Sequence, residues 1–363
     1  MQLFQNQFER TSDSHTGLRC ALKLLALLIA CFCCLTLFSQ RLQAEDLVSL
    51  NPTGPKSPTQ LRGTVLEYTG EVLILRTIGG REDQIAGSKV TGIQYTKISS
   101  HQLADKAFAN KKYQNATIAY GQAMQLEDRR WVKREILAQL SWCHRYQGQI
   151  DLAGEDFLLI VRSDPTTRLL GEMPLAWMNH VVSIELERRA VSWIQNRELP
   201  YAQLMGASWL LFTVDRKTCI SVLKSLELNP NPIIAQLAEM QLRRTKLHLA
   251  IPAQIDMWEA QITRLPKTVR AGPTYLISKA RDRQKEPEVP EVTALSYMKI
   301  PILYPRHHHL VSDALFQTAR QLEELERPEE AARIYREVIT NYQHTASSNE
   351  AKLALEQLLE ASD

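Results

Sequence analysis

The spacing of apolar positions predicts that most of the chain is helical. From about residue 97 to the C-terminus, apolar residues recur every three to four positions, which is typical of amphipathic α-helices. One such segment, residues 327–343, reads RPEEAARIYREVITNYQ and has Pro328 near its start. Proline is favoured at the first helical position because the N–H group that it lacks would have no partner there. A second segment, residues 290–297, reads PEVTALSY and repeats the order of proline, glutamate and tyrosine.

Several of these predicted helices share a small residue followed four positions later by an aromatic one. A small residue lets two helices approach closely, and the aromatic side chain on the same face fills the neighbouring groove. The pattern, with threonine as the small residue in one case, occurs at Ala116 and Tyr120, Ala153 and Phe157, Thr293 and Tyr297, and Ala331 and Tyr335. In three of these four segments another small residue lies twelve positions earlier, where a preceding helix is predicted. We therefore expect each segment to be the second helix of a hairpin.

This arrangement resembles the tetratricopeptide repeat (TPR), a helix–turn–helix unit of about 34 residues. The resemblance implies a mainly α fold, a TPR-like α-solenoid of helical hairpins. It places two repeats over residues 97–167 and two over 273–346, with degenerate helical hairpins over 168–272 and a C-terminal helix over 347–363. Within the degenerate part, residues 173–196 read as one long amphipathic helix. Such an array is quasi-linear, so damage to one repeat is expected to stay near that repeat.

A different pattern precedes the helices, over residues 61–96, where glycines alternate with Val, Ile, Leu and Thr. The pairs Thr69-Gly70 and Gly79-Gly80 supply the residues that tight hairpin turns require. We expect a small antiparallel β module, a meander with strands near residues 62–68, 72–78, 82–86 and 90–95. This module resembles a small SH3- or Sm-like barrel. Residues 45–60 contain three prolines and are predicted to form a Pro-rich linker.

The first 44 residues have the three-part pattern of a secretory signal peptide. Arg19 and Lys23 form a basic region, residues 24–38 form an apolar core, and the small residue Ala44 precedes Glu45. We expect cleavage between Ala44 and Glu45, which gives an exported protein of bacterial type in the periplasm or another extracytoplasmic space. Two alternatives are an uncleaved N-terminal anchor and acylation of Cys31 in a lipobox-like run, and either would attach the protein to a membrane through this segment.

Composition and charge argue against nucleic acid as a partner. The 363 residues carry a formal net charge of +3, and part of this excess lies in the first 44 residues. A nearly neutral remainder gives no electrostatic reason to expect nucleic acid or an anionic membrane surface. Of the six cysteines, only Cys143 and Cys219 follow the leader, and both lie on apolar helical stripes. We expect them to be buried thiols.

No catalytic motif stands out in the sequence, which contains no G-x-S-x-G, Walker, G-x-G-x-x-G or H-E-x-x-H pattern. The most conspicuous cluster is His307, His308 and His309. Adjacent residues of a helix point about 100° apart, and no cysteine or carboxylate lies beside these histidines at ligand spacing. We interpret them as a solvated helix start, and we expect no enzymatic activity, no cofactor and no metal.

The TPR resemblance implies a protein or peptide partner. In TPR arrays the first helix of each hairpin lines a concave groove, and its groove-facing positions contact the bound segment. Carried over position by position, the candidate partner-binding residues are Asp105, Phe108, Trp142, Arg145, Tyr275, Asp282, Lys285, Asp313, Phe316 and Arg320. Aromatic rings beside cations suit an extended peptide. The alternative is that Trp142 and Phe316 pack against the next repeat and that Arg145 and Arg320 are simply solvated.

The predicted function is therefore a non-catalytic, protein-binding scaffold of the cell envelope. Two alternatives belong to other classes: a ligand-binding protein, whose β module binds for example a glycan, and an accessory subunit of an envelope enzyme complex.

Overall fold

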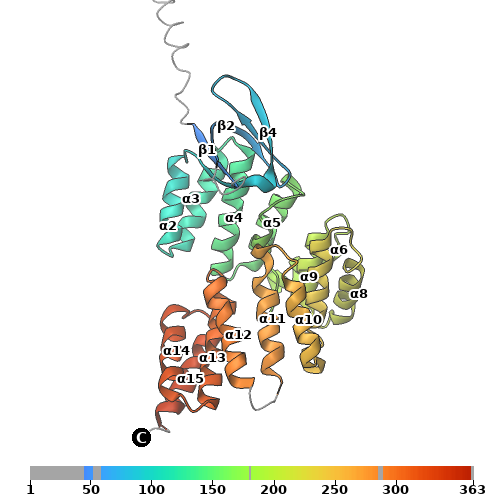
Figure 1. The fold of residues 1–363 in the computed structure, drawn as a ribbon, viewed down its shortest axis with the longest axis vertical. Coiled ribbons are helices and arrows are strands. Elements are labelled where there is room, and N and C mark those ends of the chain that lie inside the picture. The colour runs from blue at the N-terminus through green and yellow to red at the C-terminus, as the bar shows by residue number, and fades with distance from the viewer. Residues whose placement is uncertain (1–44, 52–58, 180, 285–288, 361–363) are drawn as a thin grey trace, which may run out of the picture. The chain divides into compact units, whose positions relative to one another are not determined.

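A computed structural model describes residues 45–51, 59–179, 181–284 and 289–360. The chain is mainly α, a TPR-like α-solenoid of helical hairpins preceded by a small antiparallel sheet, which confirms the predicted fold class (Figure 1). The expected signal peptide up to Ala44 and the candidate residue Lys285 lie outside the described residues. Within the described ranges, no helix combines the length and apolar character needed to cross a membrane.

The chain divides into two compact units. The first contains the described residues up to Val65 together with Leu75–Asp83 and Lys89–Thr96. The second contains Leu66–Ile74, Gln84–Ser88 and all residues from Lys97 onwards. Most of the sheet thus belongs to the first unit, whereas the turn between its second and third strands belongs to the helical unit.

The sheet has five strands in the order β4-β3-β2-β1-β5. They are β1 Asp46–Leu50, β2 Gln60–Tyr68, β3 Val72–Arg76, β4 Glu82–Ala86 and β5 Val90–Gln94. Four of them lie where the sequence predicts strands. The prediction of a linker over 45–60 was wrong for the first part of this range, because that part forms β1. This strand pairs with β2 and with β5. The last strand therefore pairs with β1, and the sheet is not the four-stranded meander that the sequence predicts.

Strand β1 escaped prediction because its only apolar alternation spans five residues and prolines follow it. Val48 is fully buried and lies opposite Leu61 of β2 and Ile93 of β5. Asp46 is also buried, and its Oδ2 accepts a hydrogen bond from the Val65 amide at 2.8 Å. The buried carboxylate thus has a partner that fixes the β1–β2 register.

Fourteen α-helices occur in the described residues, and successive helices form hairpins (Figure 1). They are α2 Ser99–Ala109, α3 Tyr113–Leu126, α4 Arg130–Tyr146, α5 Ile150–Ser163, α6 Ile184–Gln195, α7 Pro200–Leu210, α8 Arg216–Leu226, α9 Pro232–Arg243, α10 Pro252–Ile262, α11 Ala271–Asp282, α12 Val289–Leu303, α13 His308–Glu324, α14 Pro328–Asn341 and α15 Ala346–Glu360. Short 3-10 turns, η2 Leu170–Glu172, η3 Leu247–Leu249 and η4 Lys267–Val269, connect some of them.

Local sequence explains where several of the helices begin. Prolines occupy the first turn of α7, α9, α10 and α14. The prediction of a single long helix over residues 173–196 was wrong, because α6 begins only at Ile184. The Ser183 hydroxyl accepts a hydrogen bond from the Leu186 amide at 3.2 Å and caps this helix. Glu185 and Glu187 follow in the first turn, where the helix dipole favours negative charge.

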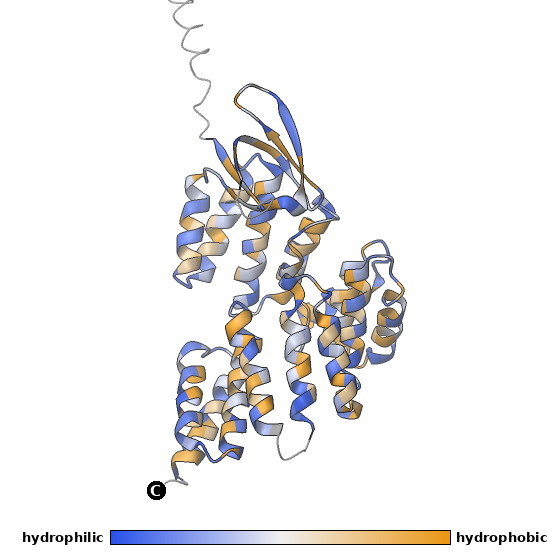
Figure 2. Cartoon of the chain, viewed as in Figure 1, coloured by the Kyte–Doolittle hydropathy of each residue, from blue (hydrophilic) through white to orange (hydrophobic). Residues whose placement is uncertain are grey.

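The solenoid core consists of the small and aromatic residues that the repeat pattern contains. Ala116, Ala153 and Ala331 are fully buried, and the aromatic residues four positions later, Tyr120, Phe157 and Tyr335, are at most 1% exposed. Many helices carry both apolar and polar residues (Figure 2), and the apolar ones pack against neighbouring helices. The two cysteines after the leader, Cys143 and Cys219, are buried free thiols, as predicted, and burial raises their pKa values to about 12.

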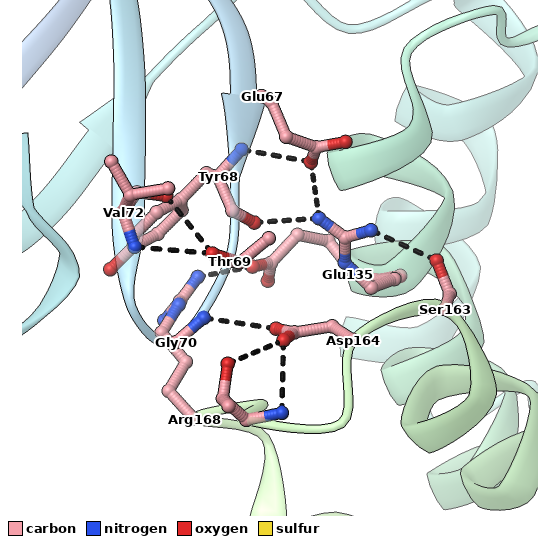
Figure 3. Close-up of polar contacts among 11 residues, drawn as sticks. Glu67, Tyr68, Thr69, Gly70, Val72, Glu135, Ser163, Asp164 and Arg168 are labelled. Atoms are coloured by element: carbon pink, nitrogen blue, oxygen red, sulfur yellow. Dashed lines mark hydrogen bonds and ion pairs between the residues drawn. The ribbon is translucent and has the colours of Figure 1, made fainter. Parts of the chain in front are cut away.

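The turn between β2 and β3 is held against α4 by a buried arginine (Figure 3). Arg134 is 3% exposed, and its Nη2 donates to the Tyr68 carbonyl oxygen at 2.7 Å and to the Glu67 carboxylate. Its Nη1 donates to Ser163 Oγ of α5 at 2.9 Å. The guanidinium charge is thus paired and hydrogen-bonded, as a buried charge must be.

A second contact holds the tip of the same turn. Asp164, which follows α5, accepts a hydrogen bond from the Gly70 amide at 3.0 Å (Figure 3). A Cβ atom at Gly70 would lie 1.7 Å from the Thr166 carbonyl oxygen, so only glycine fits here. The glycine that the sequence assigns to a tight turn therefore also allows the turn to approach the helices.

Candidate protein-binding cleft

Two carboxylates predicted to face a partner are instead hydrogen-bonded to side chains of their own or the next hairpin. Asp105 of α2 accepts hydrogen bonds from Tyr120 Oη of α3 at 2.7 Å and from Lys97 Nζ at 2.6 Å. Asp282 of α11 accepts from Tyr297 Oη of α12 at 3.0 Å and from Gln321 Nε2 of α13 at 3.1 Å. Both carboxylates therefore serve the packing of the repeats.

Trp142 and Arg145 lie in a cluster of aromatic and cationic side chains. Trp142 is 3% exposed, and the guanidinium carbons of Arg145 and Arg306 lie 3.9 and 4.5 Å from its ring centre. Burial lowers the pKa of Arg145 to about 10, an effect that the nearby Glu172 partly opposes. Trp142 is therefore packed, but against Arg306 and His307 and not against the next repeat, and Arg145 is partly buried beside it.

Two of the three histidines, His307 and His308, also belong to this cluster and are partly buried, which corrects the interpretation of a solvated helix start for these two, whereas His309 is exposed. The His307 ring meets the Trp142 ring edge-on at 5.1 Å, and the His308 ring stacks on Tyr146 at 4.3 Å. Burial, with nearby cations, holds the pKa of His307 well below its usual value and lowers that of His308 to about 4. The partners lie far away in the sequence, so the local pattern could not indicate this contact. Among the described residues, no group of three His, Cys, Asp or Glu side chains could hold a metal ion.

The remaining candidates divide between packing, surface and cleft. Phe108 is partly buried, and its ring lies 5.7 Å from that of Tyr113. Phe316 is 7% exposed and packs on Tyr335, with ring centres 5.7 Å apart, so it is packed, but within its own hairpin and not against the next repeat. Arg320 is exposed, as the packing alternative expects.

Two predicted residues, Tyr275 and Asp313, line a wide cleft. Tyr275 Oη donates to Asp313 Oδ2 at 2.5 Å, and Lys279 Nζ lies 3.9 Å from the same oxygen. Burial, reinforced by the Asp313 charge, raises the pKa of Tyr275 well above its usual value, so the hydroxyl stays protonated and donates. This pair forms part of the wall of a cavity of about 620 Å³.

We call this cavity the basic cleft. Its walls come from the α7–α8 connection, the end of α9 with η3, and the helices α11, α13 and α15. Its lining contains four arginine or lysine side chains, Arg216, Arg244, Lys279 and Arg283, and two carboxylates, Asp313 and Glu350. Trp177 and the 41% exposed Phe212 add aromatic surface. The cleft therefore has a positive balance of charge and apolar area beside it.

One cation of the basic cleft is structural. Arg244 is 7% exposed and donates to the carbonyl oxygens of Ser208 at 2.8 Å and Met178 at 3.0 Å. It also donates to Gln241 Oε1 at 2.6 Å, and burial lowers its pKa to about 9. Arg244 thus ties α7, α9 and the segment before α6 into one wall and is not free for a ligand.

The other cations of the basic cleft can meet a ligand. Arg216 and Arg283 are exposed, and within the described part of the chain neither has an acidic partner. Arg216 lies 5.8 Å from the centre of the Phe212 ring. The sequence pattern did not indicate Arg216 because α8 lies in the degenerate hairpins, nor Arg283 because no groove-facing TPR position falls on it. One usable signal was the spacing of Lys279 and Arg283, four apart on one helix face.

Comparison with known families finds one match. The tetratricopeptide repeat model matches residues 313–345, which cover most of α13 and all of α14. This match and the helical hairpins support a TPR protein. No curated protein and no solved structure matches the chain.

Proposed function

We propose that the protein is a non-catalytic scaffold that binds a protein partner through the basic cleft, and that the partner offers carboxylates to it. The observation that carries this proposal is the pair of exposed guanidinium groups, Arg216 and Arg283, in the cleft wall without an acidic partner in the described ranges. A guanidinium group binds a carboxylate through two parallel hydrogen bonds. The TPR match supports protein binding, because such repeats generally serve protein–protein interaction.

The partner in this proposal is an acidic segment with at least one apolar or aromatic side chain. Lys279 is already opposite Asp313, so a bound carboxylate competes with that pair for the ammonium group. Phe212 and Trp177 offer area for an apolar anchor beside the cations. The opposite charges of cleft and partner would then raise the association rate constant, and the apolar anchor would lower the dissociation rate constant.

The place of this scaffold, in our proposal, is the cell envelope or another extracytoplasmic space. The basic region, apolar core and Ala44-Glu45 boundary of the first 44 residues support this. The chain either begins at Glu45 after cleavage or stays attached to a membrane by its N-terminal segment. The absence of a catalytic motif from the sequence supports a binding role.

The test compares two double charge reversals by pull-down from the native cell envelope. The double variant Arg216→Glu, Arg283→Glu removes both exposed guanidinium groups of the cleft. We expect it to bind the partner at least tenfold more weakly, a loss of about 1.4 kcal/mol in binding free energy, and therefore to recover less of it. The matched control, Arg333→Glu with Arg336→Glu, makes the same change of charge at two exposed positions of α14. The control should retain the partner, and rising salt should weaken the wild-type complex.

Equal recovery of the partner by both double variants would show that the basic cleft is not the site. The mass of the recovered wild-type chain also reports its N-terminus. A first residue of Glu45 supports export with cleavage, whereas an intact N-terminus or an acylated Cys31 supports attachment to a membrane.

A further inference from the structure

A second groove, of about 880 Å³, lies between the first two hairpins and the last one. It is bounded by the α2–α3 turn, the start of α3, the α4–α5 turn and the α14–α15 connection. Five of its lining side chains are amides, Gln114, Gln147, Gln149, Asn341 and Gln343. We call it the amide groove, and it shares only His309 and Thr345 with the basic cleft.

The amides of this groove are available to a ligand in different degrees. Gln147 is held in place, since its Nε2 donates to Thr117 Oγ1 at 2.9 Å and to the Cys143 carbonyl oxygen at 3.1 Å. Gln114 and Gln149 are exposed, and their side-chain amides have no hydrogen-bond partner in the described structure. Each of these two amides offers both a donor and an acceptor, which matches a hydroxyl group, itself donor and acceptor.

Stacked aromatic rings form a rigid part of the groove. The Tyr146 ring lies between Tyr113, at 4.5 Å, and His308, at 4.3 Å between centroids. Tyr342 meets His308 edge-on at 5.7 Å. Burial raises the pKa values of Tyr113 and Tyr342, so both hydroxyls stay neutral near pH 7. Held rings lose little side-chain entropy when a ligand binds, which favours affinity.

The rest of the lining excludes several ligand classes. Among Lys, Arg, Asp and Glu residues, only Lys111 lines the amide groove. One lysine provides too little positive charge to bind the phosphate backbone of a nucleic acid. No carboxylate lines the groove, so it does not suit a cationic ligand. No Leu, Ile, Val, Met or Phe lines it either, so its apolar surface is that of aromatic rings.

We propose that the amide groove binds a neutral oligosaccharide. Hydroxyl groups along such a chain pair with the free amides, and the sugar rings lie against the half-buried tyrosines Tyr113 and Tyr342. The cavity volume falls in the range of about 300–1,000 Å³ that is usual for small-molecule sites. This site is independent of the basic cleft, and its ligand is independent of the protein partner proposed above.

The test measures binding of four neutral hexasaccharides, maltohexaose, cellohexaose, laminarihexaose and chitohexaose, by titration calorimetry with the full chain. We expect at least one to bind with a Kd below about 1 mM. Replacing three exposed amides, Gln114→Ala, Gln149→Ala and Gln343→Ala together, should weaken this binding at least about tenfold. The matched control is Gln122→Ala, at an exposed amide of α3 outside the groove.

Each other outcome contradicts the proposal. It is overturned if none of the four hexasaccharides binds, if the triple variant binds as the wild type does, or if the groove takes peptides from a random peptide library and no sugar. Unchanged circular dichroism and thermal midpoint confirm that the triple variant is folded, which is expected because all three positions are exposed. The double variant Arg216→Glu, Arg283→Glu should keep its affinity for the sugar. The sugar titration and the pull-down therefore test the two proposals independently.

Discussion

At the scale of single residues, the repeat pattern identified the buried small and aromatic residues of the clear repeats but not the partner of each side chain. The predicted ligand residues Asp105 and Asp282 accept hydrogen bonds from Tyr120 and Tyr297, the aromatic residues of the repeat pattern itself. The two pairs have the same sequence separation of 15, so this spacing is a signal that could have assigned them. A buried tyrosine hydroxyl needs a partner, and the carboxylate supplies it.

A buried carboxylate in the cluster around Trp142 leads to a prediction at this scale. Burial raises the pKa of Glu172 to about 7, although Arg306 and Arg145 lower it. The folded protein therefore holds a proton on Glu172 that the unfolded chain releases at a lower pH. From about pH 4.5 to 7, the free energy of unfolding should fall as the pH rises, by up to about 3 kcal/mol from this group.

Replacing the carboxyl group by an amide removes this contribution. In Glu172→Gln, the change in the free energy of unfolding between pH 5 and pH 8 should differ from that of the wild type by this amount, as measured by urea denaturation at each pH. Glu185→Gln, at an exposed position of α6, is the control and should leave the pH dependence unchanged. If Glu172→Gln has the wild-type pH dependence, then burial of Glu172 does not govern its protonation.

At the scale of helices and strands, local rules predicted the structure well wherever they act within a few residues. Four strands and the helices of the four clear repeats lie close to the expected positions, because hairpin glycines, first-turn prolines and apolar periodicity are local signals. Strand β1 and the start of α6 were not predicted. The first depends on pairing with distant strands, and the second on Ser183, whose cap interrupts an apolar pattern that continues on both sides.

The packing of α6 on α7 gives a prediction for this scale. A Cβ atom at Gly206 of α7 would lie 2.4 Å from the Ala190 carbonyl oxygen of α6, a backbone atom that cannot move away without shifting the helix. Gly206→Ala should therefore lower the free energy of unfolding by about 1–3 kcal/mol. Gly121 of α3 is the control, since a Cβ atom there would meet nothing within 4 Å.

Gly121→Ala should instead stabilise the protein by about 0.5–1 kcal/mol, because glycine within a helix loses more backbone entropy than alanine. Urea denaturation of both variants measures these opposite shifts. A stabilised Gly206→Ala protein would mean that α6 and α7 do not pack as closely as the structure shows.

At the scale of the helical unit, the sequence predicted an array whose repeats contact their neighbours, and the structure adds a contact across the array. Tyr146 Oη at the end of α4 donates to the Arg306 carbonyl oxygen at 2.9 Å, and the rings of Trp142 and Tyr146 meet those of His307 and His308. The basic cleft is also assembled from segments far apart in the sequence. Repeat periodicity carries no information about such pairs, so neither the cluster nor the cleft could be predicted.

The contact across the array changes what a local defect should do. Ala331 is fully buried in α14, and Ala331→Phe should overpack α13 against α14 at a cost of about 1–3 kcal/mol. In a strictly linear array, the damage would stay in α13, α14 and the helices next to them. Because α13 begins at His308, beside Tyr146, we expect amide hydrogen exchange to increase in residues 140–146 of α4 as well, while α8 stays protected.

Arg333→Phe, which adds the same ring at an exposed position of α14, is the control and should leave both regions unchanged. Faster exchange in α13 and α14 with wild-type protection in α4 would show that the contact between α4 and residues 306–308 does not couple the two ends of the array.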